Sequence, residues 1–253
     1  IMVGAFVILT AITKAGLPPA AAILISVVFC TVLGIVIEKI AYRPLRKASS
    51  NLAVLITAIG VSYLLQNLAL LIFGADAKSF VTVIDVPSVS LFGGQLVIKG
   101  ITIVTIVVSV IIMVALTFFV QKTKPGRAMQ AVSEDRDAAQ LMGVNVNATI
   151  SLTFAIGSGL AAIAGLLLCS AYPTLTPYTG AMPGIKAFVA AVFGGIGSIP
   201  GAMVGGILLG VIEIFGKAYI SSQVADAIVF AVLIIVLLVK PTGLFGKNIQ
   251  EKV

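Results

Sequence analysis

Almost the whole chain consists of apolar runs separated by short polar segments. A helix needs about 20 consecutive apolar residues to cross the hydrocarbon core of a bilayer. Runs near this length recur along the sequence, so we expect several transmembrane helices. The apolar runs cover residues 1–13, 18–37, 52–73, 101–120, 148–171, 185–197, 200–216 and 223–239.

The composition leads to the same conclusion. Hydrophobic residues make up 60% of the chain and charged residues 10%, whereas a soluble domain carries roughly 25% charged residues. The sequence therefore predicts an all-α integral membrane protein, a polytopic transmembrane helix bundle with a single domain over residues 1–253. The first apolar run starts at Ile1 with no basic segment before it. This start indicates a truncated N-terminus rather than a signal peptide.

The net charge of +7 comes from bases in short loops beside the apolar runs. This placement argues against a nucleic-acid partner and for a role in membrane orientation. If 38–51 is cytoplasmic, then 121–147 and 240–253 are cytoplasmic too, provided that 185–197 crosses the membrane. That side then holds 11 basic residues against 5 outside, as the positive-inside rule favours. The 11 are Lys39, Arg43, Arg46, Lys47, Lys122, Lys124, Arg127, Arg136, Lys240, Lys247 and Lys252, and the 5 are Lys14, Lys78, Lys99, Lys186 and Lys217.

The C-terminal third is rich in small residues. The 185–197 run is short and glycine-rich, so it is either a tilted or broken span or a re-entrant segment. Glycines spaced by four let helix backbones approach closely in a membrane. We therefore expect helix packing within one subunit, with a subunit interface or a transport path as the alternatives, at Gly197, Gly201, Gly205, Gly206 and Gly210.

Ionisable and amide side chains inside apolar runs are costly and are candidates for function. Glu213 and Lys217 have the spacing of a structural ion pair on one helical face, and a role in gating is the alternative. Asp226 begins the last run and is a candidate cap. Gln66 and Asn67 lie within 52–73, where they either hydrogen-bond between helices or line a polar path. The sequence contains no histidine, phosphate-binding loop or metal-ligand cluster, so no catalytic, cofactor or metal site is expected.

The segment 74–100 holds two apolar stretches that flank Gly93 and Gly94, which is typical of a small hairpin. It is expected on the external face. Two interpretations remain open: a loop that lies on the membrane, or a contact site for an external partner.

The polar segment 121–147 has the signals of folded structure. A short helix can start at Pro125. Ser133 is expected to cap a second helix of about ten residues, with Glu134 and Asp135 in its acidic first turn, and Gly143 is expected to end it. The alanines Ala138 and Ala139 make this helix slim enough for a groove on a cytosolic partner, although an ordinary amphipathic loop is the alternative.

The stretch from Gly126 to Gly143, GRAMQAVSEDRDAAQLMG, resembles the cytoplasmic coupling motif of ABC-importer permeases. Similarity to the permease family for branched-chain amino acids, of the high-affinity H-subunit type, covers essentially the whole chain. It is carried also by YRPLR at 42–46, GIKAFVAAVFGGIGSIPG at 184–201 and KPTGLFG at 240–246. The family has further N-terminal sequence with another span, and we expect this chain to begin inside that sequence, which leaves the total number of spans open.

The resemblance implies a transport subunit of the bacterial or archaeal plasma membrane, with no catalysis of its own. An external binding protein would deliver leucine, isoleucine or valine. A second related permease would complete the path, and two cytosolic ABC ATPase subunits would drive it. The residues implied to couple the chain to an ATPase are Ser133, Glu134, Asp135, Ala138, Ala139, Leu141 and Gly143.

Other functions remain open from the sequence. A related ABC permease could carry urea or short amides. An ion-coupled secondary carrier would need Glu213, Lys186 or Asp226 in its path. A membrane scaffold or intramembrane enzyme is a further alternative, which the absence of catalytic motifs disfavours.

Overall fold

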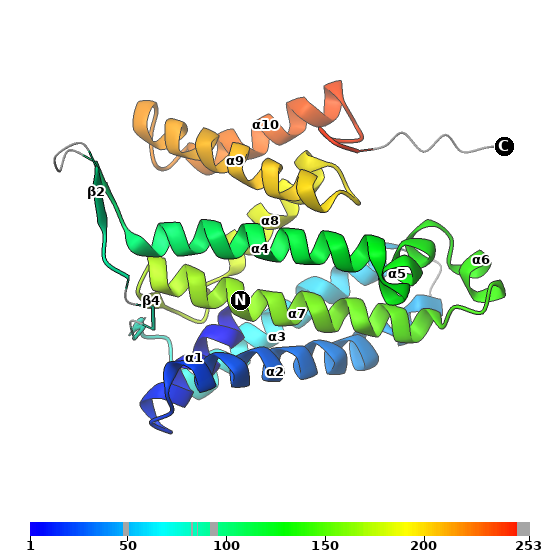
Figure 1. Ribbon diagram of the computed structural model, residues 1–253, viewed down its shortest axis with the longest axis horizontal. Helices are drawn as coiled ribbons and strands as arrows, with labels where there is room; N and C mark the ends of the chain where they lie inside the picture. Colours follow the sequence, from blue (N-terminus) through cyan, green and yellow to red (C-terminus); the bar gives the residue numbers. More distant parts are fainter. Residues whose placement is uncertain (48–50, 82, 85, 92–95, 247–253) are drawn as a thin grey trace. The chain divides into compact units, whose positions relative to one another are not determined.

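The computed structural model describes residues 1–47, 51–81, 83–84, 86–91 and 96–246. Its described residues are mainly α-helical, with two small two-stranded sheets (Figure 1). The chain forms two compact units. Unit 1 combines Ile1–Ser109 with Val120–Gly180, and unit 2 combines Val110–Phe119 with the chain from Ala181 onward.

Unit 1 is organised around three packed helices. Helix α1 (Met2–Thr13) contacts α2 (Pro19–Ile37), and both contact α7 (Val146–Ala171). Phe6 and Ile8 of α1 are almost completely buried in this core. Helix α2 continues through a π-helical turn, η1 (Glu38–Tyr42), into a 3₁₀ turn, η2 (Pro44–Lys47), and α3 (Asn51–Phe73) follows.

Small residues allow α2 and its neighbours to approach closely. Ser26 of α2 donates a hydrogen bond to the Gly4 carbonyl of α1 at 2.8 Å. A Cβ atom on Gly159 of α7 would lie only 2.9 Å from Thr31 Oγ1 of α2. The absence of a side chain at Gly159 thus leaves room for Thr31 where α2 and α7 meet.

Short strands form at one end of unit 1. Strand β1 (Lys78–Ser79) pairs antiparallel with β4 (Thr174–Leu175), and β2 (Val89–Leu91) pairs antiparallel with β3 (Leu96–Ile98). The hairpin expected within 74–100 is therefore confirmed. Gly93 and Gly94, which were expected between the two strands, lie outside the described residues.

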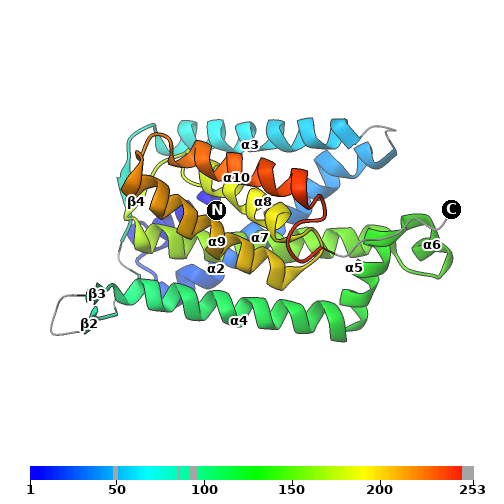
Figure 2. The same cartoon turned by 90° about the horizontal axis from the view of Figure 1, so that it is seen from above.

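The segment after α4 (Gly100–Lys122) folds as two more helices. Helix α5 (Lys124–Glu134) is followed directly by α6 (Arg136–Leu141), which leads into α7 (Figure 2). Helix α6 contacts both α5 and α7. The polar segment 121–147 is thus mainly helical, as its turn and cap residues predict.

Unit 2 contains three helices that pack on one another. Helix α8 (Ala181–Gly194) packs against α9 (Ile199–Tyr219), and α10 (Ala225–Val239) contacts both. Their buried core contains Val189, Phe193, Leu209 and Val229. The tight turn expected between the 185–197 and 200–216 runs joins α8 to α9, with positive φ angles at Gly195 and Gly197.

Five segments of the described chain are long and apolar enough to cross a membrane. These segments are Pro19–Tyr42, Leu52–Phe73, Gly100–Lys122, Val146–Ala171 and Ile199–Tyr219. The expected all-α polytopic membrane fold is confirmed. Helices α1, α8 and α10 are shorter, and the 14 residues of α8 extend about 21 Å against a hydrocarbon core of about 30 Å. Whether α8 crosses therefore stays a prediction.

Candidate coupling segment and the polar contacts of the spans

Helix α5 starts as the sequence predicts and runs further than expected. Thr123 is its N-cap, whose Oγ1 accepts a hydrogen bond from the Gly126 N–H at 3.2 Å, and Pro125 occupies the first turn. The helix then continues through Ser133 to Glu134. Ser133 Oγ donates to the Gln130 carbonyl at 2.7 Å.

The prediction that Ser133 caps the second helix is therefore wrong. Asp135 is the N-cap of α6, and its Oδ1 accepts hydrogen bonds from the N–H groups of Asp137 and Ala138 at 2.9 and 3.0 Å. A carboxylate satisfies two free N–H groups and complements the helix dipole. The second helix is consequently six residues long instead of about ten, and Glu134 ends α5.

The end of α6 has the expected glycine. Gly143 adopts φ +83° after the C-cap residue Met142. Its N–H donates to the Gln140 carbonyl, and the Val144 N–H donates to the Ala139 carbonyl, both at 3.0 Å. This pair of bonds is the Schellman motif, which favours glycine at the left-handed position.

The two neighbouring alanines of α6 have different environments. Ala139 is buried inside unit 1 with 5% of its surface exposed, whereas Ala138 is exposed. Leu141 and Met142 are 88% and 84% exposed. The exposed apolar side chains of α6 and its C-cap are therefore Ala138, Leu141 and Met142, beside the exposed polar Arg136, Asp137 and Gln140, and Ala139 instead anchors the helix to its own chain.

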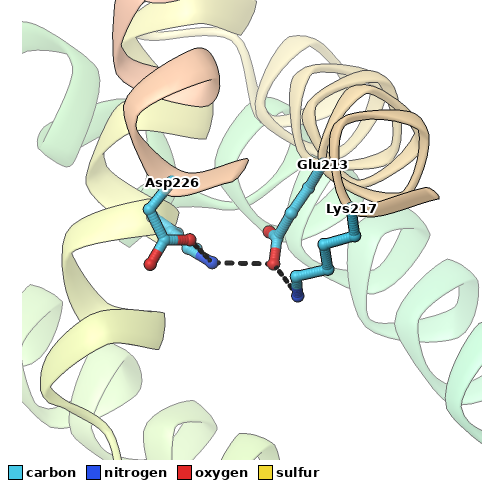
Figure 3. Close-up of polar contacts among 4 residues, drawn as sticks. Glu213, Lys217 and Asp226 are labelled. Atoms are coloured by element: carbon cyan, nitrogen blue, oxygen red, sulfur yellow. Dashed lines mark hydrogen bonds and ion pairs between the residues drawn. The ribbon is translucent and has the colours of Figure 1, made fainter. Parts of the chain in front are cut away.

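A network of four charged side chains joins the helices of unit 2 (Figure 3). Lys186 Nζ of α8 lies 2.9 Å from Glu213 Oε1 of α9 and 2.7 Å from Asp226 Oδ1 of α10. Lys217 Nζ lies 2.6 Å from the same Glu213 oxygen. The expected Glu213–Lys217 pair is confirmed, and two cations balance two anions.

Two expectations about polar side chains in the spans are wrong. Asp226 does not cap α10, because Val224 is the N-cap and has no side-chain cap bond. Within the described part of the chain, Gln66 and Asn67 make no hydrogen bond to another helix, and the alternative that they line a polar path stays a prediction. Their side-chain amides donate within α3, to Ser62 Oγ at 3.3 Å and to the Tyr63 carbonyl at 2.8 Å.

The five glycines expected to pack helices, four in α9 and Gly197 just before it, have three kinds of surroundings. A Cβ atom on Gly201 would lie 2.6 Å from the Gly194 carbonyl oxygen, and one on Gly205 would lie 2.5 Å from the Ala190 carbonyl oxygen. A Cβ atom on Gly206 would make an ordinary contact with the Ala190 side chain. A Cβ atom on Gly197 or Gly210 would have no described neighbour within 4 Å, so close packing within unit 2 does not require glycine at these two positions.

A buried carboxylate escaped the sequence interpretation. Glu38 of η1 is fully buried and accepts a hydrogen bond from Ser151 Oγ of α7 at 2.5 Å. Its position at the end of the 18–37 run was a visible signal, because charged residues are rarely buried without partners. The partner, 113 positions away, was not visible.

The last described residues pack on the turn between α8 and α9. The N–H groups of Leu244 and Phe245 donate to the carbonyls of Phe193 and Gly194, each at 2.9 Å. Gly243 has φ +76°, and a Cβ atom there would lie 2.6 Å from the Val192 carbonyl oxygen. The motifs at 184–201 and 240–246 therefore form one structural feature.

The five long apolar segments define a multi-pass membrane protein. The sequence model of the family described as "Branched-chain amino acid transport system / permease component" matches residues 1–237. The chain belongs to this family.

Three relatives are similar over most of their length. The chain is 42% identical over 262 residues to the high-affinity branched-chain amino acid transport system permease protein LivH of Salmonella typhimurium, which covers 100% of the chain and 82% of that protein. It is 44% identical over 238 residues to LivH of Escherichia coli K12, with coverage of 90% and 74%. It is 42% identical over 258 residues to BraD of Pseudomonas aeruginosa, with coverage of 98% and 83%. No solved structure matches.

Proposed function

We propose that this chain is a permease subunit of an ATP-driven ABC importer and forms half of a membrane path for leucine, isoleucine and valine. An external binding protein delivers the amino acid, a second related permease completes the path, and two cytosolic ABC ATPase subunits supply the energy. Family membership and the names of the relatives support the substrate class. The chain itself performs no catalysis in this proposal.

The observation that carries the coupling role is the exposed apolar end of α6. Leu141 and Met142 are almost fully exposed, although the helix is held firmly by its Asp135 cap, its Gly143 terminus and the buried Ala139. Burial of one such side chain in a partner contributes about 1.5–3 kcal/mol. A rigid helix with an uncovered apolar tip is suited to a groove on another protein.

The faces of two spans are consistent with a larger assembly. Only 6% of the most apolar stretch of α3 is buried within the described chain. None of the corresponding stretch of α4 is buried there. Ser62, Tyr63 and Asn67 give the exposed surface of α3 a polar component. Polar groups in a span usually face a bundle interior or a water-filled path, so we assign this face of α3 to the second permease or to the path.

The experiment is co-purification of the ATPase encoded with this permease, together with substrate uptake. Changing Leu141 and Met142 to serine should reduce both at least tenfold, because about 1.4 kcal/mol corresponds to a tenfold change in affinity. Membrane insertion and thermal stability should stay unchanged, since neither side chain packs within the chain. Gln140→Ser, an exposed polar change on the same helix, is the control and should bind normally. Normal ATPase binding by the double variant would refute the coupling role of α6.

The paired network of unit 2 bears on the ion-coupled alternative. A secondary carrier was expected to need Glu213, Lys186 or Asp226 in its path, and these three residues instead lie in one charge-balanced cluster with Lys217. Uptake that continues with ATP and without a proton gradient supports the importer. Uptake that stops with an uncoupler at constant ATP supports a secondary carrier.

A further inference from the structure

A cavity of about 530 Å³ lies in unit 1 between the end of α2, η1 and the start of α7. Its apolar wall includes Ile35, Leu152 and Ala155, and its polar end includes Lys39, Arg43 and Asn145. No residue of α6 or of the ion network lines it. The cavity is therefore separate from both features described above.

The lining changes from apolar to basic along the helix axes. On α2 and η1, Ile35 precedes Lys39 by one helical turn and Arg43 by two. On α7, Ala155 lies eight residues after Asn147, which is about 12 Å deeper in the span. This gradient follows the direction from hydrocarbon to water, which is also the direction along a phospholipid from acyl chain to headgroup.

The charges at the polar end are available for an anion. Lys39 and Arg43 are exposed, and neither forms an ion pair with another described residue. The neighbouring Glu38 carboxylate is fully buried and accepts a hydrogen bond from Ser151. Asn145 Oδ1 accepts from the Ala148 N–H at 3.1 Å, which leaves the Asn145 amide nitrogen as a further donor.

We propose that this cavity binds an anionic phospholipid, with its phosphate between Lys39 and Arg43 and an acyl chain along Ile35, Leu152 and Ala155. A basic pocket between transmembrane helices is suited to an anionic headgroup, and Arg binds phosphate with two parallel hydrogen bonds. The apolar wall distinguishes a lipid from a free phosphate ion, which has nothing to place against it.

The proposed lipid cavity lies close to α6, the helix that we propose to bind the ATPase. Asn145 and Asn147 also line a second cavity of about 450 Å³ whose other residues include Arg136 and Gln140 of α6. A bound headgroup would therefore lie next to the junction of α6 and α7. The lipid site requires only the geometry of unit 1, so it stands even if the proposed transport function fails.

The chain contains no tryptophan, so one introduced tryptophan reports the local lipid. Leu152→Trp places the reporter in the cavity wall, and Ile56→Trp places a control reporter on the exposed surface of α3. Each full-length variant is reconstituted in phosphatidylcholine vesicles that contain either dibrominated phosphatidylglycerol or dibrominated phosphatidylcholine. Quenching at residue 152 should show a preference for phosphatidylglycerol of roughly fivefold for each of the two basic residues. Quenching at residue 56 should show little preference.

Charge variants then identify the headgroup contacts. Lys39→Gln with Arg43→Gln should abolish the preference at residue 152, whereas Lys39→Arg with Arg43→Lys should retain it and Lys122→Gln should not alter it. Equal quenching by the two lipids, or a preference that survives the double glutamine change, overturns the proposal. Displacement of the brominated phosphatidylglycerol by inorganic phosphate at constant ionic strength also overturns it, because it indicates a site for a soluble anion. Absence of quenching by either lipid means that protein covers the cavity and overturns it as well.

Discussion

At Gly205 the backbones of α8 and α9 approach so closely that a single added carbon has no room. A Cβ atom there would lie 2.5 Å from the Ala190 carbonyl oxygen and 3.0 Å from the Gly194 nitrogen. Both neighbours are backbone atoms, so relief requires the helices to move apart. Close packing of small residues supplies much of the attraction between membrane helices, and the loss of this contact weakens unit 2 as a whole.

We predict that Gly205→Ala lowers the thermal stability of the detergent-solubilised protein by the equivalent of about 1–3 kcal/mol, the usual cost of overpacking. Gly210→Ala is the matched control on the same helix, because open space surrounds its Cβ position among the described residues. It should leave stability unchanged or raise it slightly, since alanine favours the helix. Equal effects of the two substitutions in a thermal unfolding assay would contradict the observed contact.

Ser151 provides a second test at the level of one side chain. Its hydroxyl donates to the buried Glu38 carboxylate at 2.5 Å, and hydrogen bonds to charged groups contribute about 1.5–3 kcal/mol. Ser151→Ala should therefore reduce the free energy of unfolding by an amount in that range. Thr153→Ala is the control, because the Thr153 hydroxyl bonds only to the Thr149 carbonyl of its own helix at 3.0 Å and should matter little.

At the level of elements, the sequence could predict α5 and the end of α6 because their signals are unambiguous. Pro125 fits only the first turn of a helix, and Gly143 supplies the positive φ that ends one. The boundary between α5 and α6 was missed because Ser133 and Asp135 are both good caps. The hydrogen bond of Ser133 to the preceding turn leaves the capping position to Asp135.

Neighbouring alanines on α6 show another limit of sequence reasoning. Successive residues on a helix point about 100° apart, so Ala138 and Ala139 cannot both face the same partner. Which of them faces inward depends on how α6 packs against α5 and α7, and that contact is tertiary. The sequence identified the pair but not the buried member.

We predict opposite consequences for the same substitution at these two positions. Ala139→Trp should lower thermal stability and membrane yield, because the buried site has no volume for an indole and overpacking costs about 1–3 kcal/mol or more. Ala138→Trp should leave stability unchanged and reduce ATPase co-purification, because this side chain is exposed beside the apolar tip. Thermal unfolding and affinity capture, measured on both variants, separate the two effects. A stable Ala139→Trp protein would show that α6 is not anchored as described.

At the level of the whole molecule, contacts within each unit test the proposed sidedness of the loops. The cavity that joins Lys39 and Arg43 to Asn145 and Asn147 brings the 38–47 and 121–147 segments to one end of unit 1. The pairing of β1 with β4 brings together the two segments 74–99 and 172–180. Both of these segments are expected on the opposite side of the membrane from 38–47 and 121–147. Both groupings agree with alternating loops. In unit 2, the hydrogen bonds of Leu244 and Phe245 join the segment 240–246 to the end of α8, where the α8–α9 turn begins.

Long-range pairing is the part that the sequence could not provide. Glu213 and Asp226 were recognised as unusual charges in apolar surroundings, and Lys186 was considered only for an ion-coupled carrier. The meeting of the three depends on α8, α9 and α10 packing together. The partner of Glu38 depends in the same way on contact between η1 and α7. Local patterns define helices reliably, whereas charge pairing across helices requires the tertiary fold.

The topology gives the last prediction. We expect cysteines introduced at Gln130 and Phe245 to be inaccessible to a membrane-impermeant maleimide in intact cells, and a cysteine at Asp76 to react. Gln130 and Asp76 are exposed, and Phe245 is 55% exposed, so burial in the protein does not protect them. The natural Cys30 and Cys169 are buried and should add little background.

Permeabilised cells, in which all three positions should react, are the control for this experiment. Phe245 decides the role of the short helix α8. If the cysteines at positions 245 and 130 both fail to react with the maleimide in intact cells, α8 crosses the membrane. Lys240, Lys247 and Lys252 are then cytoplasmic, as the distribution of basic residues favours. Labelling of Phe245 from outside while Gln130 stays protected would instead mean that α8, or the similarly short α10, does not cross, and it would leave three basic residues on the external face. Labelling of Gln130 from outside would reverse the whole orientation and exclude docking of α6 to a cytosolic ATPase.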